Sequence, residues 1–243
     1  RIVSAALALL ASAIAPGFVH AQGGFTELSL TDTLLNTSPN TDFWIASVAP
    51  ADVDADGDLD LLVAGYYVVY FGSVEHSLTL YRNNGPVPGS WAFTPISVDA
   101  TDLFFGSGDI AWGDYDGDGD PDAVVGGEGS TTLYRNDAGT LLRTSTVLPA
   151  YQEDPDFLTM DQRSLTWADL DNDGDLDLML PCASDGFGGL PAMVMRNDGP
   201  GTGDAWTFTD TGQPLPLTTT AATAWADMDG DGDLDLMFAT MGQ

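Results

Sequence analysis

The sequence repeats one aspartate-rich decapeptide four times, and this repetition limits the possible folds more than any other feature. The copies are residues 51–60, 113–122, 168–177 and 226–235. After a small first residue, each copy reads Asp-x-Asp-x-Asp-Gly-Asp-x-Asp, and the first aspartates are 62, 55 and 58 residues apart. A recurring period of this length indicates an array of similar structural units.

Short apolar segments surround each aspartate loop in the same order. An apolar stretch ending in Trp precedes three of the loops, and a β-prone run such as residues 61–63 follows each loop. A third stretch ends in Arg-Asn in three units, and a Trp-x-Phe-Thr stretch follows in two of them. Four short strands in about 58 residues match one β-propeller blade. We therefore expect an all-β fold, a β-propeller of four-stranded blades with about four blades visible and an incomplete ring.

The Trp and Met residues beside the loops fall on alternating strand positions, which favours the core over a ligand site. The residue just before each loop is small (Ala51, Gly113, Ala168 and Ala226). Small residues at this point fit close packing, as where inner strands crowd around a central axis.

The charge of the chain excludes two classes of partner. The sequence has 37 Asp and Glu residues against 6 Arg and no Lys, a formal net charge of -31. Nucleic acids and anionic lipids both require a basic surface, which this composition does not supply. Because 44% of the residues are hydrophobic, the chain can still build a core. Twenty of the 37 acidic residues lie in the four repeats, so most of the charge is patterned.

Residues 1–21 have the features of a secretory signal peptide. An apolar run without charges spans residues 2–15, and small residues lie at 19 and 21. The run is too short to span a membrane, so we expect no membrane insertion after its removal. The alternative is a buried N-terminal helix. We expect a secreted chain that begins near Gln22, and Cys182, the single cysteine, rules out an intrachain disulfide.

The aspartate loops have the spacing of a calcium site. Carboxylates at loop positions 1, 3, 5 and 9, a backbone carbonyl at position 7 and a Gly at position 6 can wrap one Ca²⁺. Mg²⁺ is disfavoured because it requires stricter geometry and retains more of its water. An EF-hand is excluded because position 12, a Glu in that motif, is Val63, Val125, Leu180 or Phe238. Thrombospondin-like calcium repeats are excluded because their regular cysteines are absent. We expect about one Ca²⁺ per loop, four in total.

These motifs resemble the FG-GAP/VCBS repeats found in the heads of integrin α-chains and in many secreted bacterial proteins. The resemblance rests on the four loops, the preceding Trp-Ala/Gly-Asp and the following Arg-Asn-x-Gly-like strand end, and it spans residue 25 to the C-terminus. It implies that each loop joins the first and second strands of a blade. The implied ligands, with the position 7 residue acting through its backbone, are Asp52, Asp54, Asp56, Asp58, Asp60, Asp114, Asp116, Asp118, Asp120, Asp122, Asp169, Asp171, Asp173, Asp175, Asp177, Asp227, Asp229, Asp231, Asp233 and Asp235.

Propellers of this family usually have about seven blades, whereas this sequence shows four loops. Residues 24–27 resemble the fourth-strand element at 91–94, so an N-terminal strand is a candidate to complete the last blade. The fourth unit reaches Gln243 without a third-strand Arg-Asn element, which leads to the hypothesis of a C-terminal truncation. The alternative is a small four-bladed ring or one completed by oligomerisation.

No catalytic or cofactor-binding residue is predicted. His76 is the single histidine after the signal segment, and no nucleophile elbow or phosphate loop accompanies it. The acids Glu153, Asp154, Asp156 and Asp161 are interpreted as a solvated loop rather than as a carboxylate pair for sugar chemistry. The recurring arginines Arg82, Arg135 and Arg196 are expected to form structural pairs with acids.

We therefore expect a non-enzymatic binding or adhesion scaffold for an extracellular protein or a glycan. Segments 66–77, 97–108 and 145–163 are the predicted contact surface. The first alternative is the propeller domain of a secreted polysaccharide-active enzyme. The second is a structural repeat of a surface layer or fibre, which predicts self-association. The sequence leaves open the identity of the ligand and the use of the glycosylation sequon at Asn36.

Overall fold

The computed structural model describes residues 43–68, 74–87, 90–101, 109–127, 130–149, 164–180, 192–215 and 220–240. All regular secondary structure in these ranges is β-strand, which confirms the predicted all-β fold. Among the described residues, no helix has the length and apolarity that a membrane span requires. The predictions on residues 1–21, Gln22, residues 24–27, Asn36, Cys182 and Gln243 lie outside these ranges. Those on Glu153, Asp154, Asp156 and Asp161 do so as well.

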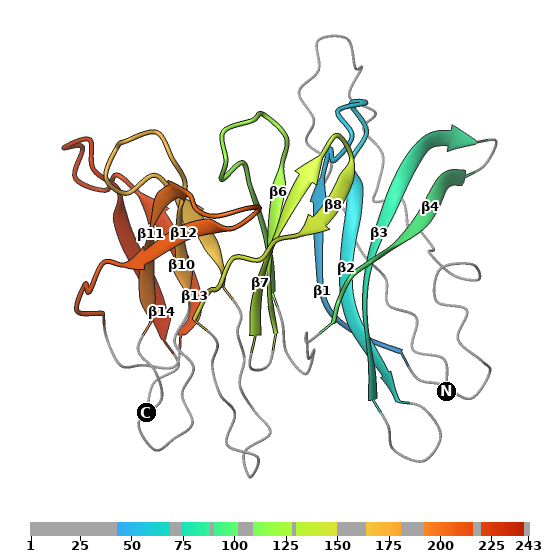
Figure 1. The fold of residues 1–243 in the computed structure, drawn as a ribbon, viewed down its shortest axis with the longest axis horizontal. Helices are drawn as coiled ribbons and strands as arrows, with labels where there is room; N and C mark the ends of the chain where they lie inside the picture. The colour runs from blue at the N-terminus through green and yellow to red at the C-terminus, as the bar shows by residue number, and fades with distance from the viewer. Residues whose placement is uncertain are drawn as a thin grey trace, which may run out of the picture.

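The described strands form four antiparallel sheets, which follow one another along the chain (Figure 1). Sheet I consists of β1 (Phe43–Ala51), β2 (Asp60–Val68), β3 (Val74–Val87) and β4 (Ser90–Val98). Sheet II consists of β5 (Asp109–Gly113), β6 (Asp122–Gly127), β7 (Ser130–Asp137) and β8 (Thr140–Arg143). Sheet III consists of β9 (Thr166–Ala168), β10 (Asp177–Leu180), β11 (Met193–Pro200) and β12 (Trp206–Asp210). Sheet IV consists of β13 (Thr220–Ala226) and β14 (Asp235–Thr240).

Each aspartate loop joins the first two strands of its sheet. The strand pairs close at Ala51 with Asp60, Gly113 with Asp122, Ala168 with Asp177 and Ala226 with Asp235. The first strands of consecutive sheets contact one another, β1 with β5, β5 with β9 and β9 with β13. The described sheets do not close into a barrel. The arrangement is that of an incomplete β-propeller of about four blades, as the sequence predicted.

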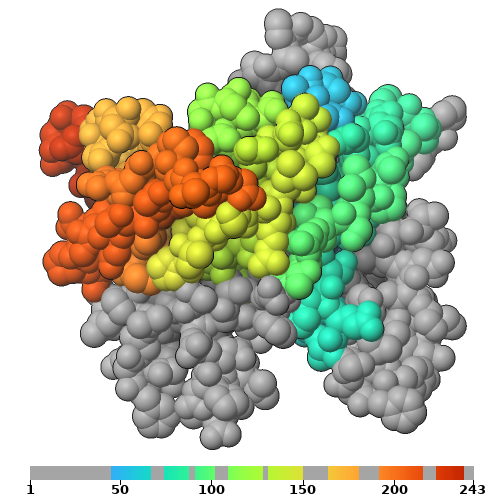
Figure 2. Space-filling model, in the orientation of Figure 1, coloured from blue at the N-terminus to red at the C-terminus, as the bar shows by residue number. Residues whose placement is uncertain are grey.

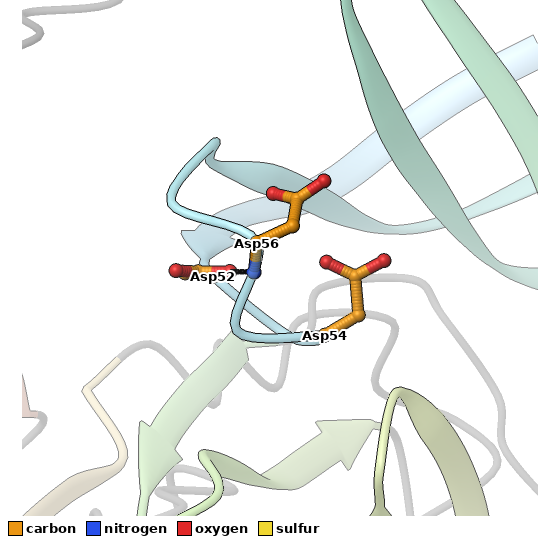
Figure 3. A group of neighbouring side chains, drawn as sticks. All are labelled: Asp52, Asp54 and Asp56. Carbon is orange, nitrogen blue, oxygen red and sulfur yellow. Dashed lines mark hydrogen bonds between the residues drawn. The ribbon is translucent and has the colours of Figure 1, made fainter.

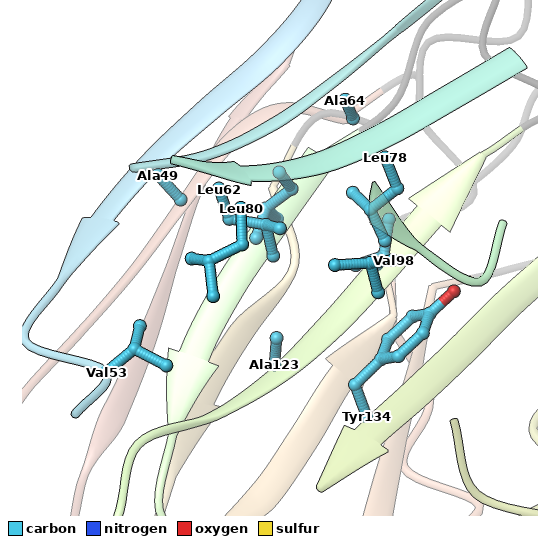
Figure 4. Close-up of a cluster of buried hydrophobic side chains, with 11 residues drawn as sticks. Ala49, Val53, Leu62, Ala64, Leu78, Leu80, Val98, Ala123 and Tyr134 are labelled. Atoms are coloured by element: carbon cyan, nitrogen blue, oxygen red, sulfur yellow. The ribbon is translucent and has the colours of Figure 1, made fainter. Parts of the chain in front are cut away.

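The core lies between consecutive sheets. Leu62 and Leu80 of sheet I pack against Ala123 and Tyr134 of sheet II (Figure 4). The opposite face of sheet II packs in the same way on sheet III, and sheet III packs on sheet IV. The second strands of sheets II and III are therefore covered on both faces, which explains why residues 123–125 and 178–180 are apolar runs without alternation. Figure 2 shows β12 of sheet III lying against the chain that follows β8, where the N–H of Trp206 donates to Oγ1 of Thr146 at 2.9 Å.

Two details add to the sequence expectation. Sheet II has a fourth strand, β8, although its sequence lacks the Trp-x-Phe-Thr element seen in sheets I and III. Thr140 and Leu142 on this strand are exposed, and β8 has only four residues, so its pattern was too weak to detect. The small residue before the second loop has a specific cause, because a Cβ on Gly113 would lie 2.7 Å from Cδ1 of Trp167 in sheet III.

Candidate metal centre

The four aspartate loops share one backbone conformation. The glycine at position 6 has a positive φ in each loop, from 94° at Gly57 to 99° at Gly232. Nothing lies within 4 Å of a Cβ built on Gly57, so the left-handed backbone, and not a lack of space, requires glycine there. Position 4 is also left-handed, with φ of 57° at Ala55 and 58° at Asn172. The backbone therefore takes the left-handed conformation at two positions within three residues, which makes the turn sharp.

The carboxylate at position 1 organises the start of each loop. Asp52 accepts backbone hydrogen bonds from Asp56 at 3.1 Å and Gly57 at 3.0 Å. Asp169 accepts the equivalent pair at 3.1 Å and 3.1 Å. The carboxylate at position 5 accepts the N–H of position 7 in every loop, at 2.9 to 3.0 Å. These bonds hold the carboxylates at fixed positions without a basic side chain.

The position 9 aspartates join the loop to the third strand. Asp122 is fully buried, and its Oδ2 accepts the N–H of Tyr115 at 3.2 Å. Its Oδ1 accepts the N–H of Asn136 at 2.7 Å. Asp60 and Asp177 form the same two bonds in sheets I and III. Because burial disfavours the charged form, the pKa of Asp122 is raised to about 7, and the pKa values of Asp60 and Asp177 are also raised.

The asparagine of the Arg-Asn motif joins one sheet to the next. Nδ2 of Asn136 in sheet II donates to the carbonyl of Val53 in the loop of sheet I, at 2.8 Å. Nδ2 of Asn197 in sheet III donates to the carbonyl of Tyr115 in the loop of sheet II, at 2.9 Å. The Oδ1 atoms of both side chains accept a backbone N–H from a nearby turn glycine. The sequence analysis assigned no role to these asparagines, although their recurrence after Arg in three units was a usable signal.

The loops gather carboxylates that could hold a metal ion. In each group below, one carboxylate oxygen per residue lies within 4.8 Å of the others. The groups are Asp52, Asp54 and Asp56 (Figure 3); Asp114, Asp116 and Asp122; Asp169, Asp171 and Asp173; and Asp227, Asp229 and Asp235. Oxygen ligands of one Ca²⁺ bind at 2.3–2.6 Å and thus lie at most about 5 Å apart, so this separation fits a shared cation.

Two buried carboxylate oxygens without a hydrogen-bond partner support the fit of a cation to these loops. Oδ1 of Asp54 and Oδ1 of Asp114 are buried and have no hydrogen-bond partner. A buried carboxylate oxygen without a donor is unfavourable unless a cation compensates it. Burial also raises the pKa of Asp116, and the neighbouring Asp118 adds to this effect. The residues present are hard oxygen donors, which suit Ca²⁺ better than a transition metal.

The structure brings together part of each predicted ligand set. Positions 1 and 3 belong to every group, position 5 belongs to those of loops 1 and 3, and position 9 to those of loops 2 and 4. The position 7 residues Asp58, Asp120, Asp175 and Asp233 belong to none, and their predicted ligand is the backbone carbonyl. The full assignment of five aspartates per loop stays a prediction.

The recurring arginines pair with acids, as predicted. Nε of Arg82 lies 3.1 Å from Oδ2 of Asp54, at position 3 of its own loop. Arg196 lies 2.5 Å from Asp198, and Arg135 lies 4.0 Å from Asp137. In sheet I, Asn84 stands where the other two sheets have Asp137 and Asp198, and Arg82 pairs with the loop aspartate instead. Arg82 also donates to the carbonyl of Gly139 in sheet II, a second link between these sheets.

His76 lies outside the loops, on β3. It is half-buried, and burial lowers its pKa. Its ring centroid is 6.3 Å from that of Tyr66, in a tilted arrangement. These contacts are those of a packed side chain.

The model of the FG-GAP-like repeat matches residues 67–125 and 114–180. The first matched segment begins at the end of β2 and the second at the start of the loop after β5. Each segment ends in the second strand of the next sheet, so the repeat runs across the boundary between two sheets. Among curated proteins and solved structures, none matches the chain significantly.

Proposed function

We propose, on the basis of the FG-GAP-like repeat model that matches residues 67–125 and 114–180, that the chain is a secreted calcium-binding scaffold that binds an extracellular protein or a glycan without catalysing a reaction. The observation that carries the proposal is the recurrence of one loop geometry with three carboxylate oxygens within 4.8 Å in all four sheets.

Calcium would supply the positive charge that the loops lack. Each loop contains five aspartates in nine residues, and in sheet I one of them, Asp54, pairs with Arg82. Repulsion among these carboxylates opposes folding, and a divalent cation reverses its sign. The loops of sheets I and II contact the next sheet through Val53 and Tyr115, so an ion bound there would stiffen the array as well as the loop.

Calcium titration by isothermal calorimetry tests the metal part of the proposal. The expected result is about four sites, with much weaker binding of Mg²⁺. Asp116→Asn should remove one site, and Asp137→Asn, an exposed acid outside the loops, should leave the number unchanged. Absence of calcium binding, or equal binding of both ions, would overturn the assignment.

Secretion is tested by expression of the chain in a host with a secretory pathway. N-terminal sequencing of the exported protein should give a mature end near Gln22. Retention of residues 1–21 in an intracellular product would contradict the proposal.

Binding and catalysis are separated by one pair of assays on the secreted protein. A glycan array and pull-down from extracellular protein should show calcium-dependent capture, and the same glycans should remain intact. Turnover that is lost in Glu153→Gln or Asp156→Asn would establish the enzyme alternative. Light scattering that rises on addition of calcium alone would favour the structural repeat.

A further inference from the structure

Loop 1 of the array, residues 51–60, differs from loops 2 and 3 in one contact. Nε of Arg82 on β3 lies 3.1 Å from Oδ2 of Asp54, which is at position 3 of this loop. In sheets II and III the equivalent arginine pairs instead with an acid two residues later on its own strand. These pairs are Arg135 with Asp137 and Arg196 with Asp198. In sheet I alone of these three sheets, an arginine is therefore paired with a candidate metal ligand.

One residue accounts for this difference. Asn84 stands where the other two strands have the acid, so β3 offers Arg82 no carboxylate at that point. The side chain of Asn84 donates instead to Oγ1 of Thr94 on β4, at 2.9 Å. The guanidinium of Arg82 is thus left to pair with the loop.

The guanidinium is also held from sheet II. Its Nη2 donates to the carbonyl of Gly139 in the turn between β7 and β8. A Cβ built on Gly139 would lie 2.7 Å from Nη2 of Arg82 and 2.9 Å from Cβ of Asp54, so the three residues are in close contact. The side chains of Arg82 and Asp54 are 28% and 21% exposed, so water screens their charges only in part.

This ion pair does not satisfy the carboxylate. Nε of Arg82 and Oδ1 of Asp54 are both buried, and neither has a hydrogen-bond partner. The 3.1 Å contact is therefore an attraction between charges without the geometry of a hydrogen bond. Asp54 also belongs, with Asp52 and Asp56, to the group whose carboxylate oxygens lie within 4.8 Å of one another. Arg82 offsets the charge of Asp54 and still leaves one buried oxygen without a donor.

We propose that Arg82 is an internal cation that competes with Ca²⁺ for Asp54, which makes loop 1 a weaker calcium site than loops 2 and 3. The guanidinium attracts the same carboxylate and repels a divalent ion beside it, and both effects oppose binding. The inference rests on the proposed function, because it requires that the loops bind Ca²⁺. It adds an order of filling, in which loops 2 and 3 bind first and Arg82 keeps loop 1 joined to Gly139 at low calcium.

Hydrogen exchange, measured by mass spectrometry over a series of free calcium concentrations, reads each loop separately. Residues 113–122 and 168–177 should reach half of their protection at about tenfold less calcium than residues 51–60. Arg82→Gln should lower the midpoint of residues 51–60 by about tenfold, because it removes the competing charge.

Arg196→Gln is the matched control. Its partner Asp198 lies outside the loops, so the calcium midpoint of residues 168–177 should change by less than about threefold.

Asn84→Asp tests the same inference without removing the arginine. It gives Arg82 the acid that its equivalents have, which should draw the guanidinium from Asp54 and lower the midpoint of residues 51–60. In a protein that already carries Arg82→Gln, the same substitution should change this midpoint by less than about twofold, since its effect passes through Arg82. Because Asn84 is exposed, this variant keeps the test available if Arg82→Gln does not fold.

Two results would overturn the inference and leave the calcium proposal in place. One is equal midpoints for the three loops of the unmodified protein. The other is an unchanged midpoint for residues 51–60 in both Arg82→Gln and Asn84→Asp. A lack of calcium response in every loop would overturn both proposals.

Discussion

The asparagine contact between sheets I and II gives a stability prediction of defined size. Asn136→Ala removes the donor to the carbonyl of Val53 and the acceptor for the N–H of Gly139, both at 2.8 Å. Asn136 is fully buried and Val53 is 1% exposed, so water cannot replace the lost partners. Each unpaired buried group costs about 1–3 kcal/mol, so the two groups together give a loss of about 2–6 kcal/mol in the free energy of unfolding.

The backbone bond from Asn136 to Asp122 survives this substitution, so the loss reports on the side chain alone. Urea unfolding in saturating calcium measures it. Asn84→Ala is the control, because Asn84 is exposed and donates to Oγ1 of Thr94 within its own sheet. The control should lose less than about 1 kcal/mol.

Asn197→Ala repeats the test between sheets II and III, where the donor reaches the carbonyl of Tyr115. It keeps the prediction measurable if the first variant does not fold. A loss below about 1 kcal/mol in both variants, with an unchanged denaturant slope, would refute the reasoning that these bonds stabilise the stacking of sheets.

Three further predictions concern the loops. Gly113→Ala should lower the free energy of unfolding by about 1–3 kcal/mol, because its Cβ would overlap the ring of Trp167, and equal thermal stability would contradict the close contact. Gly57→Ala should lower the free energy of unfolding by about 1–2 kcal/mol, because residue 57 has a φ of 94°. Ala55→Gly, at a φ of 57°, should raise the free energy of unfolding or leave it unchanged. The reverse order of stability would disprove the argument from backbone conformation. In chelator, the pKa of Asp122 is about 7 in the folded protein and lies above its value in the unfolded chain. The buried carboxyl is therefore tolerated in its neutral form below about pH 4, and stability is lost as the pH rises through 7 and the group becomes charged. The loss in the free energy of unfolding is at most about 4 kcal/mol. Asp122→Asn should reduce this pH dependence. An identical pH profile of stability for the wild-type protein and the variant would contradict the prediction.

Most of the architecture could be predicted from the sequence because it is local and repeated. The loop pattern fixed the strand pair on either side of it, and the glycine at position 6 has the positive φ that its sharp turn required. The pairing of Arg82, Arg135 and Arg196 with acids followed from their recurrence at one strand position. Repetition made each of these inferences stronger than one copy would have allowed.

The contacts between sheets could not be predicted, because they depend on how consecutive sheets stack. Nothing in the local sequence of Asn136 indicates that its partner is the carbonyl of Val53, 83 residues earlier. The double role of the position 9 aspartate was missed for the same reason. A ligand was expected at Asp60, whereas both of its oxygens also accept backbone hydrogen bonds, one of them from β3. The left-handed conformation at position 4 was missed because Ala55 gives no signal for it.

These contacts give the loops a role in the cooperativity of the array. In sheet II, Tyr115 donates its N–H to the buried Asp122 and offers its carbonyl to Asn197 of sheet III. One residue therefore connects the loop carboxylates of one sheet to the third strand of the next. An ion bound at Asp114, Asp116 and Asp122 would favour the charged form of Asp122 and so strengthen its acceptor bond to Tyr115. In a linear array, stability is approximately a sum of unit and neighbour terms. Removal of this one site by Asp116→Asn should therefore increase hydrogen exchange in β10 and β11 of sheet III as well as in sheet II. A change confined to sheet II would show that the loops act independently.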